Sequence, residues 1–207
     1  MLLQNFKKQF FELALFSTNQ VYAWYPDFDK NNFTRWAKQG YIIKIRQGFY
    51  CFSEYVSQPN FDFFVANTIY SPSYISLHTA LAFYGIIPET VVQTTSISTL
   101  KTMFFKNDLG QFSYSKIKND LFCGYSSLPF NSTGKRVVLI AQPEKAILDL
   151  LYIYPQYSTE EEILNLRFDE YIMRKELNKS RLKKYLKIFD NRALNKKIEI
   201  LQKIYDL

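Results

Sequence analysis

The chain has 207 residues, of which 47% are apolar and 18% aromatic, so it can bury the core of one domain or two small ones and is neither disordered nor fibrous. Lys and Arg number 26 against 19 Asp and Glu, and the net charge of +7 favours an anionic partner. The two cysteines, Cys51 and Cys123, exclude a disulfide framework or a cysteine-rich zinc site and favour a reducing, cytoplasmic compartment.

The charge is distributed unevenly. Residues 1–56 and 158–207 each carry a surplus of three positive charges, whereas residues 57–157 carry a surplus of one. A polar, proline-containing segment at 53–60 marks the expected boundary. The sequence therefore predicts an N-terminal domain over 1–56, a second domain over 57–157, and a helical extension of that domain over 158–207. No apolar stretch approaches the roughly 20 residues that a membrane-spanning helix needs.

The first two predicted helices are short. Apolar residues at helical spacing predict a helix over residues 5–16. Ser17 or Thr18 can cap a second helix, which Pro26 stops.

A third helix and a hairpin complete the first part. Asp29 can cap a helix over residues 30–39, and Gly40 lies just beyond its end, where a left-handed residue commonly closes a helix. Residues 41–52 form two β-rich runs, joined near Gly48, which tolerates positive φ. Three helices followed by a hairpin is the order of a winged helix-turn-helix, a fold that binds double-stranded DNA.

The third helix has two different sides. Phe33, Trp36 and Ala37 share the side expected to pack on the first two helices. The other side carries Arg, Asn and Lys residues: Arg can bond guanine, Asn can bond adenine and Lys can meet phosphate. Lys44 and Arg46 add two cations on the hairpin. An ordinary solvated helix face is the alternative, and a small domain of this kind can also be a protein-binding module. The predicted DNA-binding residues of the helix are Lys30, Asn31, Asn32, Thr34, Arg35 and Lys38.

Four motifs follow one another along the chain. They are Gly40-Tyr41-Ile42 with Arg46-Gln47-Gly48-Phe49-Tyr50, then Tyr74-Ile75-Ser76-Leu77-His78-Thr79-Ala80-Leu81, then Gly85-Ile86-Ile87-Pro88-Glu89, and finally Ala141-Gln142-Pro143-Glu144-Lys145-Ala146-Ile147-Leu148-Asp149. Together they resemble the AbiEi-type antitoxins, which are transcriptional regulators of abortive-infection systems. Thr79 and Ile86 stand where the patterns of that family have Ser and Leu.

The resemblance implies a protein of two functions. Its first half would be a winged-helix repressor that binds the operator of its own operon. Its second half would counteract a nucleotidyltransferase-like toxin encoded alongside, and in this family neutralisation does not usually need a stable complex with the toxin.

The second part of the chain predicts a small α+β domain, so the predicted fold class of the whole is α+β. Ser76 is expected to cap one of its helices, and His78 is expected to pack inside rather than to catalyse. The predicted helices are 61–70, 76–84 and 143–154, and the predicted strands are 90–99, 104–105, 110–117 and 137–141.

Glu144, Lys145 and Asp149 are the charged residues of the helix at 143–154. One interpretation is a functional site of the antitoxin domain, facing a partner or a substrate. The alternative is local: Glu144 favours the positive end of the helix dipole, and Lys145 with Asp149 forms a pair four residues apart, worth a few tenths of a kcal/mol.

The last fifty residues predict three helices, over 159–166, 169–177 and 179–206, the last broken near Asn191. Ser158 or Thr159 can complete a capping box before the acidic run 160–162. Basic residues crowd the faces opposite the apolar stripe, and they predict either a solvated surface or a second surface for phosphate or toxin. They are Lys179, Arg181, Lys183, Lys184, Lys187, Arg192, Lys196 and Lys197.

Enzymatic function is not expected. The single histidine has no identifiable nucleophile, no phosphate-binding loop occurs, and no cluster of His, Cys and acidic residues has metal-ligand spacing. The sequence therefore predicts no catalytic residue, no metal and no cofactor. The first hypothesis is a DNA-binding transcriptional regulator and antitoxin. The alternative is a protein-binding module that engages a toxin through the winged domain and binds no DNA.

Overall fold

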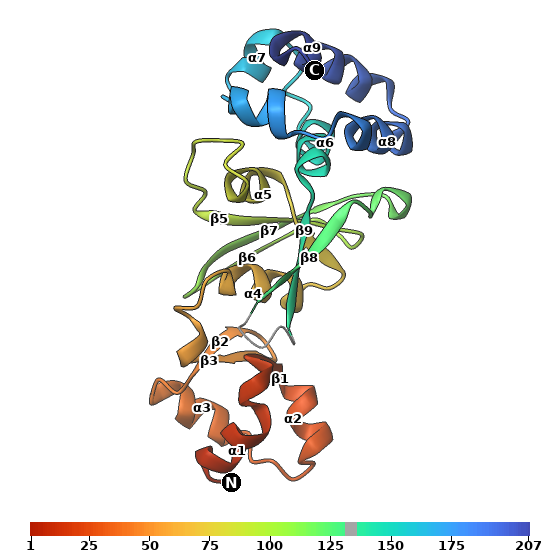
Figure 1. Cartoon of the computed structure of the whole chain (residues 1–207). Coiled ribbons are helices and arrows are strands. Elements are labelled where there is room, and N and C mark those ends of the chain that lie inside the picture. Colours follow the sequence, from red (N-terminus) through yellow and green to blue (C-terminus); the bar gives the residue numbers. More distant parts are fainter. Residues whose placement is uncertain (131–135) are drawn as a thin grey trace.

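The computed structural model describes residues 1–130 and 136–207 and shows an α+β protein, as predicted. Its elements follow one another along a single long axis (Figure 1). The N-terminal helices lie at one end, a six-stranded sheet lies in the middle, and the C-terminal helices lie at the other end.

The N-terminal unit combines three helices with a small sheet. Strand β3 lies in the middle of this sheet and pairs antiparallel with both β1 and β2. The elements are α1 (Leu3–Phe10), the 3-10 helix η1 (Phe11–Leu13), β1 (Leu15–Ser17), α2 (Thr18–Trp24), α3 (Asn31–Lys38), β2 (Ile42–Arg46) and β3 (Phe49–Phe52).

Aromatic rings fill the core of this unit. The ring of Phe6 lies 4.7 Å from that of Phe10 and 4.9 Å from that of Trp36. The expected helix over 5–16 is shorter than predicted, because Ala14 adopts a positive φ of 61° and turns the chain into β1. The prediction for Gly48 is confirmed, since this residue has a φ of 78° in the turn between β2 and β3.

The middle of the molecule is a mixed sheet with the strand order β6-β7-β5-β4-β9-β8. The pairs β5–β7 and β4–β9 are parallel, and the other pairs are antiparallel. Its elements are α4 (Phe61–Ile69), β4 (Ser73–Ile75), α5 (Leu77–Phe83), β5 (Gln93–Ser98), β6 (Met103–Asn107), β7 (Gly110–Lys116), η3 (Asn119–Leu121), β8 (Tyr125–Pro129) and β9 (Val137–Ala141). The predicted strands are present, but β4 and β8 were not predicted.

Helices α8 and α9 pack against α6, and α7 packs against α9 (Figure 1). The predicted capping box is confirmed, because Thr159 and Glu162 each bond the backbone N–H of the other. The predicted break near Asn191 is also confirmed: Asp190 has a φ of 40°, and the Asn191 side chain caps the next helix. These elements are α6 (Pro143–Ile153), α7 (Glu160–Leu164), the π-helix η4 (Ile172–Glu176), α8 (Lys179–Phe189) and α9 (Arg192–Tyr205).

The N-terminal unit contacts the sheet through the segment predicted as a boundary. A 3-10 helix, η2 (Ser53–Tyr55), connects β3 to α4, and its Tyr55 is buried against the rings of Phe61 and Phe130. Asn107 of β6 donates a hydrogen bond of 3.0 Å from Nδ2 to the carbonyl oxygen of Ile45 in β2. The two units are therefore packed together, and their independence as domains stays a prediction.

No helix in residues 1–130 or 136–207 is both long enough and apolar enough to span a bilayer.

Candidate functional site

Helix α3 buries one side and exposes the other, as its sequence pattern predicts. Trp36 is 2% exposed and Phe33 is 4% exposed, and both rings lie within 6 Å of the ring of Phe28. The five side chains on the outer side are Lys30, Asn31, Thr34, Arg35 and Lys38, and all of them are exposed. Three cations and two hydrogen-bonding side chains thus share one accessible helix face.

Asn32 does not belong to this face, which corrects the prediction. It is only 3% exposed, and its Oδ1 accepts a hydrogen bond from Nη2 of Arg35, one helical turn further on. At 100° per residue Asn32 lies at the border between the two sides, and packing turns it inward. Its side chain therefore orients the Arg35 guanidinium and is not available for a base.

The beginning of α3 is already occupied by a carboxylate. Helix α3 begins one residue later than predicted, after Lys30, but Oδ1 of Asp29 still accepts the backbone N–H of Asn31, its first residue, at 2.9 Å. Because this carboxylate holds the positive end of the helix dipole, a phosphate does not have that end available. Anion contacts on this face depend on the Lys and Arg side chains.

The two cations of the β2–β3 hairpin have different environments. Lys44 is exposed, as predicted. Arg46 is half-buried, which corrects the expectation of a free phosphate contact: its Nη1 donates to the carbonyl oxygen of Ile69 at 2.8 Å. Its guanidinium carbon also lies 4.7 Å from the ring centre of Phe105. Arg46 therefore joins the hairpin to the central sheet.

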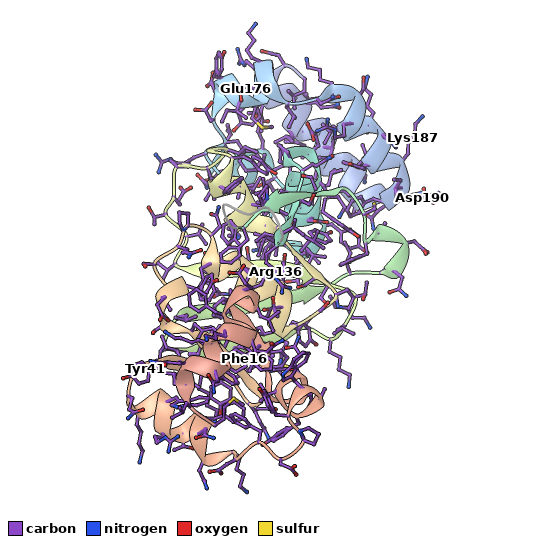
Figure 2. All side chains as sticks on the ribbon, turned by 60° about the horizontal axis from the view of Figure 1, so that its bottom comes forward. Phe16, Tyr41, Arg136, Glu176, Lys187 and Asp190 are labelled. Carbon is purple, nitrogen blue, oxygen red and sulfur yellow. The ribbon has the colours of Figure 1, made fainter. Side chains whose placement is uncertain are left out.

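Exposed aromatic residues near α3 were missed by the sequence reasoning. Trp24 ends α2 and is 57% exposed, and the neighbouring Tyr25 and the more distant Tyr41 are also exposed. Figure 2 shows Tyr41 at the edge of the N-terminal unit. The signal was present in the sequence, because Pro26 prevents the helix from continuing past Trp24 and Tyr25. No further helical turn therefore covers these two aromatic side chains.

The charged residues of α6 are buried. The predicted pairing of Lys145 with Asp149 is confirmed, but the pair lies in the interior, where the small magnitude of a solvated helix pair does not apply. Lys145 and Asp149 are both 0% exposed and form an ion pair. Nζ of Lys145 also donates to the hydroxyl of Tyr74 at 2.8 Å, and the hydroxyl of Ser76 donates to Oδ2 of Asp149 at 2.8 Å. Ser76 thus bonds this carboxylate and does not cap α5 through its side chain, contrary to the prediction. We refer to these four side chains as the buried polar cluster.

Burial determines the electrostatics of the buried polar cluster. It raises the pKa of Asp149, and this effect exceeds the opposing effect of the nearby Lys145 ammonium. Burial and the Asp149 carboxylate together raise the pKa of Tyr74 well above its ordinary value. All four side chains are 0% exposed, so the cluster connects β4, α5 and α6 rather than presenting a ligand site.

Glu144 is 1% exposed and connects α6 to α8. Its Oε1 accepts the backbone N–H of Asn178 at 2.8 Å, and its Oε2 lies 3.3 Å from Nη1 of Arg181. The three charged residues predicted as an antitoxin site are therefore all parts of the protein interior.

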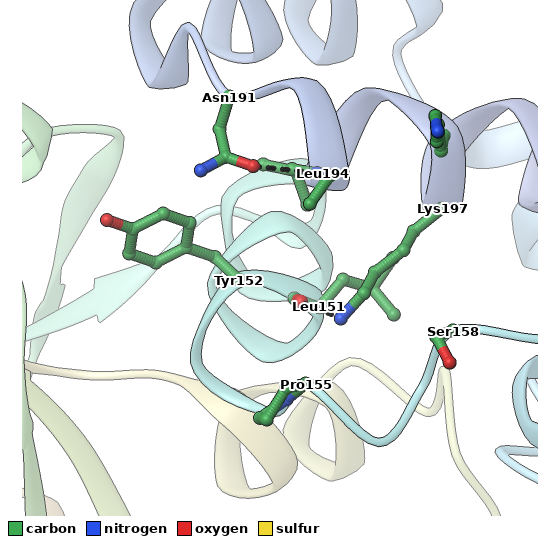
Figure 3. Close-up of a pocket in the computed structure, with 9 residues that line it drawn as sticks. Leu151, Tyr152, Pro155, Ser158, Asn191, Leu194 and Lys197 are labelled. Atoms are coloured by element: carbon green, nitrogen blue, oxygen red, sulfur yellow. Dashed lines mark hydrogen bonds between the residues drawn. The ribbon is translucent and has the colours of Figure 1, made fainter.

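The basic surface of the C-terminal helices is smaller than predicted. Lys197 is only 8% exposed and donates from Nζ to the carbonyl oxygens of Leu151 at 2.7 Å and Tyr154 at 2.9 Å. It lies beside a cavity of about 340 Å³, which Pro155 and Ser158 also line (Figure 3). Burial lowers its pKa, and its role is to satisfy the last carbonyls of α6.

The remaining lysines of α8 do lie on the surface. Figure 2 shows Lys187 projecting from the end of the molecule opposite to the N-terminal unit. The other exposed basic residues of the predicted set are Lys179, Lys183, Lys184, Arg192 and Lys196.

His78 has the packing role that the sequence predicts. Its ring centre lies 5.5 Å from that of Tyr154, and burial lowers its pKa.

No protein-family model matches the chain, and no curated protein does. The resemblance to the AbiEi-type antitoxins therefore rests on the four sequence motifs alone.

Proposed function

We propose that the chain is a transcriptional regulator that binds double-stranded DNA through a winged helix-turn-helix, with α3 in the major groove and the β2–β3 hairpin as the wing. The observation that carries the proposal is the exposed face of α3, on which Lys30, Arg35 and Lys38 lie beside Asn31 and Thr34. None of these five side chains is acidic, so the face suits a polyanion.

The order of the elements supports this proposal. A helix, a short strand, two helices and a β-hairpin follow one another, and β1 pairs with the hairpin strand β3. Because Trp36 and Phe33 are buried on the inner side of α3, the opposite face of this helix stays accessible. A DNA major groove about 12 Å wide accommodates one such helix.

The exposed side chains have different proposed roles. Arg35, which Asn32 holds in place, bonds a guanine edge, and Asn31 bonds an adenine edge. Lys30, Lys38 and Lys44 meet phosphates, and these contacts give affinity without sequence preference.

The antitoxin role is a second part of the proposal and is supported by the resemblance. Because Glu144, Lys145 and Asp149 are buried, we assign them to the fold of the second half and not to contact with a toxin. The residues that oppose the toxin then belong to the surface of residues 57–207.

Fluorescence anisotropy tests the DNA-binding proposal. The purified protein is titrated into a labelled duplex of its own upstream sequence, and into a scrambled duplex of the same composition, at several salt concentrations. We expect tighter binding to the upstream sequence and a loss of affinity with salt at both duplexes. Absence of binding at low salt would refute the proposal. It would favour the protein-binding alternative, for which the exposed Trp24 is the supporting observation.

A further inference from the structure

Strand β6 forms one edge of the six-stranded sheet and carries an apolar, exposed surface. Phe104 is 53% exposed and Met103 is 38% exposed, and Lys106 is exposed as well. An open edge of this kind presents unpaired backbone groups to other strands, and natural proteins usually protect it.

The pairing with β7 determines which backbone groups of β6 are free. Asn107 pairs with Gly110 across a two-residue turn, so these two residues exchange backbone hydrogen bonds. Because bonded and non-bonded pairs alternate along an antiparallel ladder, Phe105 also bonds to β7. The N–H and C=O groups of Phe104 and Lys106 therefore point outward, away from β7.

The side chains of Phe104 and Lys106 point to the same face of the sheet, since residues two apart in a strand share a face. Phe105 points to the opposite face, where its ring lies 5.7 Å from that of Tyr70 and its partner cation is Arg46. Among the described residues, no cation lies over the ring of Phe104. No carboxylate of these residues lies within 4 Å of the Lys106 ammonium.

We propose that β6 pairs antiparallel with β6 of a second copy of this chain, about a twofold axis through Phe105. In this register Phe104 of each copy faces Lys106 of the other. The four outward N–H groups then meet the four outward C=O groups, and each Phe104 ring receives the ammonium of the opposite Lys106. The strand is thus complementary to itself in both its backbone and its side chains, and the two sheets become one continuous sheet.

This contact is a closed, twofold interface, so association stops at the dimer. It depends on β6 alone. It therefore holds or fails independently of the proposed DNA binding, and its test contains no DNA.

Sedimentation equilibrium over a wide range of protein concentrations measures the association. We expect a reversible dimer of twice the 24.6 kDa monomer mass. Lys106→Glu removes the cation and should weaken dimerisation about tenfold or more, which corresponds to the loss of two cation–π contacts. Phe104→Pro removes an outward N–H without removing a bond to β7, and should abolish the dimer. Lys187→Glu makes the same charge change at the far end of the molecule and should leave the dimer intact.

A disulfide trap tests the register. In the double variant Phe104→Cys/Lys106→Cys, the two thiols of one copy face those of the other, so oxidation should give a covalent dimer. Each single cysteine variant serves as a control and should crosslink far less. A wild-type monomer at all concentrations would overturn the proposal. A dimer that both Lys106→Glu and Phe104→Pro leave unchanged would also overturn it. Circular dichroism establishes whether each variant is folded. If Phe104→Pro does not fold, Lys106→Glu, which is a surface change, decides alone.

Discussion

Removal of the Lys145 ammonium tests whether the buried polar cluster supports the fold. Lys145→Met keeps most of the side-chain volume but leaves the Asp149 carboxylate, which is 0% exposed, with only the hydroxyls of Tyr74 and Ser76 as partners. Breaking a buried ion pair from one side costs about 3–5 kcal/mol, because the remaining charge stays in the interior. We expect a loss of this size in the free energy of unfolding, and a similar loss for Asp149→Asn.

The double variant Lys145→Met/Asp149→Asn distinguishes a buried pair from two independent contributions. It removes both charges, while the amide oxygen of the new Asn still accepts the bonds from Tyr74 and Ser76. We therefore expect it to cost less than either single variant, within about 2 kcal/mol of the wild type. Urea unfolding followed by far-UV circular dichroism measures these values. Tryptophan fluorescence does not serve, because Trp24 and Trp36 both lie in the N-terminal unit.

The pH dependence gives an independent check of the same variant. Burial already raises the pKa of Asp149 in the folded protein, and Lys145→Met removes the cation that opposes this effect. A carboxyl group with a raised folded pKa binds its proton more tightly in the folded state, so stability is gained as pH falls through the folded pKa and is complete below the unfolded value. Lys145→Met should therefore be closer to the wild type in stability at acidic pH than at pH 7, and Asp149→Asn should show no such trend.

The buried-pair interpretation would be refuted if the double variant Lys145→Met/Asp149→Asn lost as much free energy of unfolding as the two single variants together.

The remaining predictions concern the N-terminal unit and its candidate DNA interface. Arg35→Ala should lose about 1–3 kcal/mol on the operator and discriminate poorly against a scrambled duplex, as anisotropy titrations measure. Lys44→Ala should weaken both duplexes equally and reduce the salt slope by about one. Arg46→Ala should instead lower the thermal stability, because it removes a hydrogen bond to α4 and the contact with the Phe105 ring of the central sheet. Trp36→Ala should destabilise the N-terminal unit by about 3–5 kcal/mol in urea unfolding, since the ring is 2% exposed. Residues 57–207 alone should lose operator binding and still rescue growth when co-expressed with a neighbouring toxin; persistent growth arrest with a folded fragment would contradict this division.

The elements that the sequence predicts well are those with local signals. Helix α6 begins at Pro143, whose fixed φ suits a first helical position, and α7 begins with a capping box. The strands β1 and β4 lack such signals, because each has three residues and forms by pairing with a distant segment. Leu15 pairs with Cys51, and Ile75 pairs with Ile140. Strands of this length are decided by tertiary contacts rather than by their own composition.

The exposed face of α3 could be predicted because a helix on a surface has one apolar and one polar side. The same reasoning fails for α6, whose polar residues are as buried as its apolar ones. Helices α5, α8 and α9 all contact α6, and Tyr74 of β4 bonds its Lys145 and Asp149, so this helix has no solvated side for Glu144, Lys145 or Asp149. Periodicity within one helix does not reveal how many neighbours surround it.

Three cations that the sequence places on the surface have one structural feature in common. Arg46 lies between the hairpin and α4, Lys145 lies between α6 and β4, and Lys197 lies between α9 and the end of α6. Each has a long side chain that crosses a junction between two elements and donates to oxygen atoms on the far side, which an apolar side chain cannot do. The net charge of +7 therefore consists partly of cations that an anionic partner does not reach. The exposed cations of α3, Lys44 and the lysines of α8 remain accessible, so the exposed charge, rather than the total, determines where such a partner binds.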